Sequence, residues 1–133
     1  MPKPFIYSYK VTLDDLDYMQ VVGHIRWLEI LHRARVEMIE SRGFSLQTFF
    51  ETSQGIVVRK FSLRYRKSAR LGDRLLVTVT PTKKLSFGAE MSYAVRSEDG
   101  SLLLTADLQL VFIDEFGQPM AMPAPFQEAL FDQ

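Results

Sequence analysis

One long helical pattern, in a chain that otherwise alternates like strands, limits the folds open to this sequence. From His24 to about Arg42, apolar residues recur at steps of three and four, and charged residues occupy the opposite face. The apolar positions are Trp27, Leu28, Leu31, Ala34, Met38 and Ile39. Gly43 then supplies a C-terminal cap. An amphipathic helix of about five turns must bury one face, and a sheet is the expected partner.

Most of the remaining chain alternates apolar and polar residues with the period of two that is typical of strands. The expected strands are 5–13, 56–66, 75–82, 87–96 and 102–113. A turn over 98–100 should join the last two as an antiparallel hairpin. Short helices are expected over 45–52 and 125–131. This order predicts an α+β fold, with a long central helix wrapped by a curved antiparallel sheet of about five strands.

Length and composition favour one ordinary globular domain. At 133 residues the chain is near the usual size of a domain, so 1–133 is expected to form one. Basic and acidic residues number 16 each, which predicts no general attraction to nucleic acid or to an anionic membrane. The lack of cysteine excludes disulfides, a thiol nucleophile and thiolate metal sites. With neither a signal-peptide pattern nor an apolar run of membrane length, a cytoplasmic location is expected.

Three carboxylates, Asp14, Asp15 and Asp17, precede the helix. Their simplest interpretation is as solvated loop acids that favour the positive end of the helix dipole. Asp17 also permits a catalytic interpretation, because a carboxylate near a helix N-terminus can act as base or nucleophile beside amides that bind an oxyanion. His24 is either an exposed or capping residue or a catalyst. The two histidines lack a metal-binding spacing, so no metal site is expected.

Cations are concentrated from the end of the second expected strand to the start of the third, at Arg64, Arg66, Lys67, Arg70 and Arg74. Such a cluster either protects a strand edge from aggregation or anchors the phosphates of a nucleotide-bearing ligand. No Gly-rich phosphate loop and no serine-hydrolase motif accompanies it.

The stretch 11–35, VTLDDLDYMQVVGHIRWLEILHRAR, resembles the 4-hydroxybenzoyl-CoA thioesterase family of hotdog proteins, and within it the Tol-Pal-associated acyl-CoA thioesterases. The resemblance is carried by Asp15-Leu16-Asp17, Val21-Val22, Trp27-Leu28, Ala34-Arg35 and the segment Ala69–Asp73. It implies a hotdog fold and an enzyme that hydrolyses an acyl-CoA to free acid and CoA, without metal or organic cofactor.

The resemblance also implies roles for individual residues. Asp17 corresponds to the family's catalytic carboxylate, and His24 stands where the thioester carbonyl is polarised by a backbone amide near Gly23. The substrate pocket would be lined by Tyr18, Gln20 and Trp27. Gln20 departs from the family pattern, since many members have Gly there, where a small residue shapes the turn and leaves room for the acyl group.

Proteins that this chain resembles form homodimers by joining their sheets edge to edge, or homotetramers, with the site at the interface. Arg59, Lys60, Arg66 and Arg70 would then contact CoA from the same or the neighbouring chain. Two alternatives stay open. One is a thioesterase acting on acyl carrier protein, whose acidic surface would suit the same cations. The other is a non-catalytic hotdog module that binds an acyl ligand or a protein partner.

Overall fold

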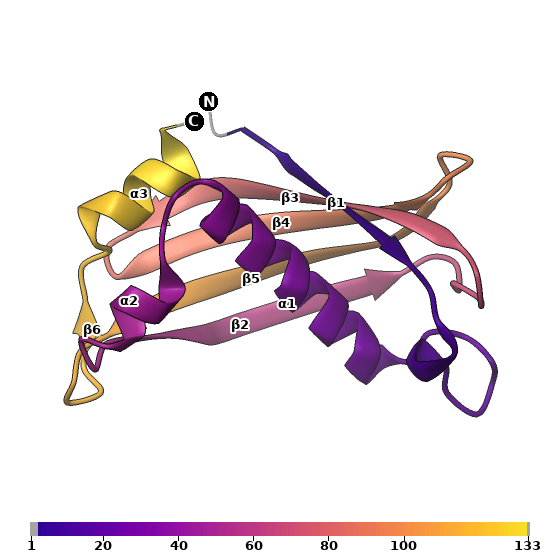
Figure 1. Cartoon of the computed structure of the whole chain (residues 1–133), viewed down its shortest axis with the longest axis horizontal. Helices are drawn as coiled ribbons and strands as arrows, with labels where there is room; N and C mark the ends of the chain where they lie inside the picture. The colour runs from indigo at the N-terminus through magenta and orange to yellow at the C-terminus, as the bar shows by residue number, and fades with distance from the viewer. Residues whose placement is uncertain (1–2, 133) are drawn as a thin grey trace.

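A long antiparallel sheet forms one layer of the molecule, and helix α1 lies across it (Figure 1). The computed structural model describes residues 3–132. Its elements are β1 (Phe5–Lys10), the 3₁₀ turn η1 (Leu13–Asp15), α1 (His24–Ser41), α2 (Leu46–Phe50), β2 (Gly55–Tyr65), β3 (Arg74–Leu85), β4 (Gly88–Ser97), β5 (Leu102–Ile113), β6 (Pro119–Met120) and α3 (Ala124–Phe131). Within residues 3–132, no helix is both long enough and apolar enough to cross a bilayer.

The sheet has six strands in the order β1-β3-β4-β5-β2, with β6 paired to β5. Every pairing is antiparallel. The predicted α+β arrangement is confirmed, and so is the hairpin of β4 and β5, whose turn has Gly100 at a φ of 90°. β6 was not predicted, because two residues carry no detectable periodicity. The first strand is shorter than predicted, since Leu13–Asp15 form a 3₁₀ turn.

One face of α1 is buried, as its sequence pattern predicts. The buried residues are Trp27, Ile30, Leu31, Ala34, Arg35, Met38 and Ile39. The predicted cap is confirmed, because Gly43 follows the helix with a φ of 92°, which favours glycine. The assignment of Leu28 to the core was wrong, since Leu28 is 44% exposed.

Aromatic rings pack the short helices α2 and α3 against the end of the sheet that lies away from the N-terminus of α1. Phe126 of α3 packs edge-on against Phe112 of β5, with ring centroids 4.6 Å apart, and against Phe44, at 4.8 Å. Phe49 of α2 makes a further edge contact with Phe112 at 5.8 Å. Edge-to-face pairs of this kind add to the stabilisation from burial alone. These packed rings therefore belong to the hydrophobic core at this end of the molecule. The N-terminus of α1 lies at the opposite end (Figure 1).

A buried cation interrupts the apolar face of α1. Arg35 is 8% exposed and donates hydrogen bonds to Tyr93 Oη, at 3.0 Å, and to His32 Nδ1, at 2.7 Å. Burial raises the pKa of Tyr93, so the phenol is neutral and accepts the bond. Burial and the nearby charges of Arg35 and Arg33 lower the pKa of His32. His32 is thus held neutral, with Nδ1 as an acceptor, a role that the sequence pattern did not reveal.

Stability should decline in acid partly because of His32. Its pKa in the folded chain lies below its ordinary value of 6.5, so the unfolded chain takes up a proton that the folded chain resists. The free energy of unfolding should therefore fall as the pH drops below about 6.5. Denaturant unfolding at a series of pH values should give a shallower decline for His32→Gln than for the wild type. An equally steep decline in His32→Gln would contradict this account.

Candidate active site

The segment between β1 and α1 folds back on itself as a tight loop. Leu16 and Val22 form an isolated antiparallel bridge across it. Inside the bridge, Asp17 N donates to Val21 O at 2.9 Å, and Gln20 N donates to Asp17 O at 3.0 Å. Asp17 is therefore the first residue of a hydrogen-bonded four-residue turn. The loop therefore places Asp17 close to the start of α1.

Gln20 closes the turn with a φ of 63°, in the left-handed region. A residue with a Cβ costs roughly 1–2 kcal/mol there, because the Cβ approaches the following carbonyl oxygen. Glycine has no such cost. The expectation that a small residue suits this turn therefore has a direct geometric basis, and Gln20 keeps its side chain in spite of the strain. Strain of this kind is found most often near functional sites.

The carboxylate of Asp17 lies against the first turn of α1. Its Oδ1 accepts a hydrogen bond from Met19 N at 2.8 Å. Its Oδ2 is 3.5 Å from the point that a Cβ on Gly23 would occupy. Gly23 is the N-cap of α1, and within residues 3–132 no side-chain hydrogen bond caps this helix start. A carboxylate and uncapped helix-start amides are thus neighbours, which is the pairing needed for attack on a carbonyl carbon.

A surface hollow at this end of α1 collects four of the predicted site residues. Asp17, Tyr18, Gly23 and His24 line it, together with Asp14, Asp15, Leu16, Ile25, Arg26 and Glu29. Tyr18 is 92% exposed, so its ring stands free beside the carboxylate. Trp27 does not open onto the hollow, because its side chain is buried in the core. Among residues 3–132, no three His, Asp or Glu side chains gather as metal ligands would.

The burial of the Asp15 side chain differs from the sequence-based prediction. The prediction of a solvated acid was wrong here, because Asp15 is 3% exposed. Tyr9 Oη donates to both of its carboxylate oxygens at 2.8 Å, and Thr12 N donates to Oδ2 at 2.8 Å. Arg26 Nε lies 3.3 Å from Oδ1. Burial and the bond to Asp15 raise the pKa of Tyr9. The Thr-x-x-Asp spacing of Thr12 and Asp15 is a capping pattern that could have revealed the bond between these two residues, but not the burial of the carboxylate.

Two of the four predicted CoA-contacting cations belong to a segment that is bonded to the loop before α1. Arg66 and Arg70 belong to the segment between β2 and β3. That segment is fastened to the loop before α1, because Val22 N donates to Ala69 O at 2.9 Å. Both arginines are exposed.

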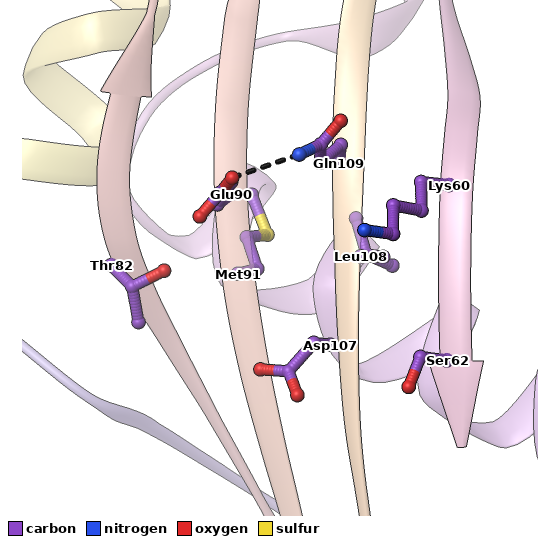
Figure 2. Close-up of a pocket in the computed structure, with 8 residues that line it drawn as sticks. All are labelled: Lys60, Ser62, Thr82, Glu90, Met91, Asp107, Leu108 and Gln109. Atoms are coloured by element: carbon purple, nitrogen blue, oxygen red, sulfur yellow. Dashed lines mark hydrogen bonds between the residues drawn. The ribbon is translucent and has the colours of Figure 1, made fainter.

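Arg59 and Lys60 are separated from the hollow. They lie within β2, at a bulge that shifts its pairing with β5 between Val58 and Lys60. Lys60 extends over the outer face of the sheet, near the hydrogen-bonded pair of Glu90 and Gln109 (Figure 2). A single chain therefore does not bring these two cations to Asp17.

Comparison with known proteins identifies relatives along nearly the whole chain. A family model described as the thioesterase-like superfamily matches residues 11–130. The acyl-CoA thioesterase YbgC of Haemophilus influenzae is 30% identical over 128 residues, which cover 94% of this chain and 93% of the relative. The acyl-CoA thioester hydrolase YbgC of Escherichia coli O6:H1 is 28% identical over 120 residues, 90% of each chain. The crystal structure of a 1,4-dihydroxy-2-naphthoyl-CoA thioesterase from Synechocystis matches with a TM-score of 0.90 at 28% identity, covering 96% of this chain and 95% of that one.

Proposed function

The chain belongs to the thioesterase-like superfamily and is a thioester hydrolase, and we propose that it hydrolyses acyl-CoA with Asp17 as the reacting carboxylate. The predicted hotdog fold is confirmed. Relatives named as thioesterases of acyl-CoA and of 1,4-dihydroxy-2-naphthoyl-CoA support CoA as the carrier. The placement of the Asp17 carboxylate beside the uncapped start of α1 carries the proposal. Within the superfamily, we assign the chain to the Tol-Pal-associated branch on its motif resemblance.

In the mechanism that we infer, the thioester carbonyl points its oxygen at the first turn of α1. Gly23 N already donates to Asp15 O at 3.4 Å, so we assign the oxyanion contact to the amide of His24. Asp17 attacks the carbonyl carbon or activates a water molecule that does so. The charge that develops on oxygen is stabilised by this amide and by the helix dipole. The C–S bond then breaks and CoA leaves as a thiolate, which needs little help from an acid. If Asp17 is the nucleophile, the acyl group remains on it as a mixed anhydride, which water then hydrolyses to the free acid and the Asp17 carboxylate. If Asp17 is the base, it takes the proton of the attacking water and the free acid forms directly.

Replacing Asp17 by Asn should lower kcat by a factor of about 100 to 10,000, because the base or nucleophile is lost. The midpoint temperature of thermal unfolding should stay at the wild-type value, because the side chain of Asp17 is exposed. The measurement is thiol release from short, medium, long and aromatic acyl-CoAs, with matched acyl carrier protein thioesters beside them. Asp14→Asn removes the same charge nearby and is the control. A wild-type rate in Asp17→Asn would refute the assignment, and binding without turnover in the parent would favour the non-catalytic module.

We propose that Arg66 and Arg70 anchor the phosphates of CoA, because both are exposed cations on the segment fastened to the site loop. Arg70→Ala should raise KM for acyl-CoA about three- to tenfold at low salt, and the difference should shrink as salt screens the contact. Lys83→Ala, at the other end of β3, should leave KM unchanged. Equal KM values for Arg70→Ala and the wild type at every salt concentration would remove Arg70 from the site.

We also propose that two copies of the chain pair through β2. This strand ends the sheet order, so in the part of the chain that the structure describes one row of its N–H and C=O groups has no strand beside it. Val57 and Val58 on it are 42% and 46% exposed. Pairing would form a homodimer, or a homotetramer of two dimers, and would let Arg59 and Lys60 serve the partner's CoA. Sedimentation velocity should show a dimer or tetramer that Val58→Lys weakens and Leu76→Lys, on β3, does not; a monomeric wild type would contradict the pairing.

A further inference from the structure

We propose that the carboxylates of Asp15 and Glu29 form a charge clamp. They bind the guanidinium of Arg26 and so hold it away from Asp17. This inference rests on the function proposed for Asp17. Arg26 lies in the first turn of α1 and lines the same hollow as Asp17. A guanidinium free in that hollow would pair with the carboxylate, and a paired carboxylate is both a weaker base and a weaker nucleophile. The site therefore needs a means of occupying this arginine.

Three contacts occupy all three nitrogens of the guanidinium. Nε lies 3.3 Å from Asp15 Oδ1, Nη1 donates to Glu29 Oε2 at 2.8 Å, and Nη2 donates to the main-chain oxygen of Asp14 at 2.9 Å. Because the group is planar, three contacts fix its orientation. Within residues 3–132, the ion pairs do not include Asp17, whose Oδ1 accepts the Met19 amide instead.

Asp15 is the fixed member of the clamp. Its side chain is 2% exposed, whereas that of Glu29 is 50% exposed. Tyr9 of β1 and the Thr12 amide hold the Asp15 carboxylate in place. Since exposed ion pairs contribute little, most of the restraint on Arg26 comes from Asp15. The ionisable groups that line the hollow with Asp17 are Asp14, Asp15 and Tyr18 of its own loop, and His24, Arg26 and Glu29 of α1. Arg66 and Arg70 lie on the segment that is bonded to this loop through Ala69 and Val22.

The clamp makes Asp15 and Arg26 positioning residues whose effects are coupled. In Asp15→Asn, the released guanidinium should pair with Asp17, lowering kcat about tenfold while KM changes less than about twofold. The acid limb of the pH profile of kcat/KM should move to lower pH, because the guanidinium favours the charged carboxylate. Adding Arg26→Gln removes the competing cation, so kcat and the acid limb should return toward wild type. Damage from a merely loosened loop would not be reversed by losing a second residue.

The Met19 amide gives a readout that needs no turnover, because it donates to Asp17 Oδ1. In proton–nitrogen correlation spectra, its resonance should move in Asp15→Asn, return in the double variant, and stay in place in Asp14→Asn, the control that removes a neighbouring charge. A wild type without thioesterase activity would overturn the proposed function but leave this test of the clamp intact.

Glu29→Gln protects the test against a folding failure in Asp15→Asn, because Glu29 is half exposed. It should move the Met19 resonance and kcat in the same directions by smaller amounts. The clamp is overturned if a folded Asp15→Asn leaves the Met19 resonance and kcat unchanged, or if Arg26→Gln does not rescue it. If Asp15→Asn does not fold, the clamp is overturned when Glu29→Gln leaves the Met19 resonance and kcat unchanged.

Discussion

The packing of α1 on the sheet is the constraint on which the rest of the molecule depends. Its buried stripe, centred on Leu31, Ala34 and Met38, decides where the N-terminus of the helix lies. β1 is held by its pairing with β3, so the loop between β1 and α1 is anchored at both ends. The bridge of Leu16 and Val22 shortens that loop further. A carboxylate on the surface is thus positioned by apolar contacts in the core, which are stronger and less easily distorted than surface polar ones.

Among the described residues, the two buried charged side chains are Asp15, which precedes this helix, and Arg35, which lies on it. Each contacts a tyrosine from a strand. The hydroxyl of Tyr9 in β1 donates a hydrogen bond to Asp15, and the hydroxyl of Tyr93 in β4 accepts one from Arg35. A tyrosine can bury its ring against apolar neighbours while its hydroxyl reaches a polar group. Because an unpaired buried charge is costly, these contacts restrict how the loop and helix can sit on the sheet. At the Asp15 end, we connect this structural requirement to the charge balance around Asp17.

Local patterns predicted the regular elements well and the burial of individual residues less well. The range predicted for the last long strand, 102–113, is the range observed for β5, because the alternation from Leu104 to Phe112 is regular. The helix from His24 was also placed correctly, whereas Leu28 was assigned to the wrong environment. Asp17, Tyr18, Gly23 and His24 were predicted together and line one hollow, because they are neighbours along the chain. Trp27 is equally close in sequence but faces the core.

By itself, the sequence determined the order of the elements, the face that most strands bury, and the presence of an acidic turn before the one long helix. These properties depend on residues a few positions apart, so periodicity and spacing are enough to reveal them. Only the tertiary structure decided that Asp15 and Arg35 are buried, that the segment around Ala69 meets Val22, and that Arg59 and Lys60 lie away from Asp17. Each of these depends on which distant segments pack together and at what angle, and no local pattern records that information.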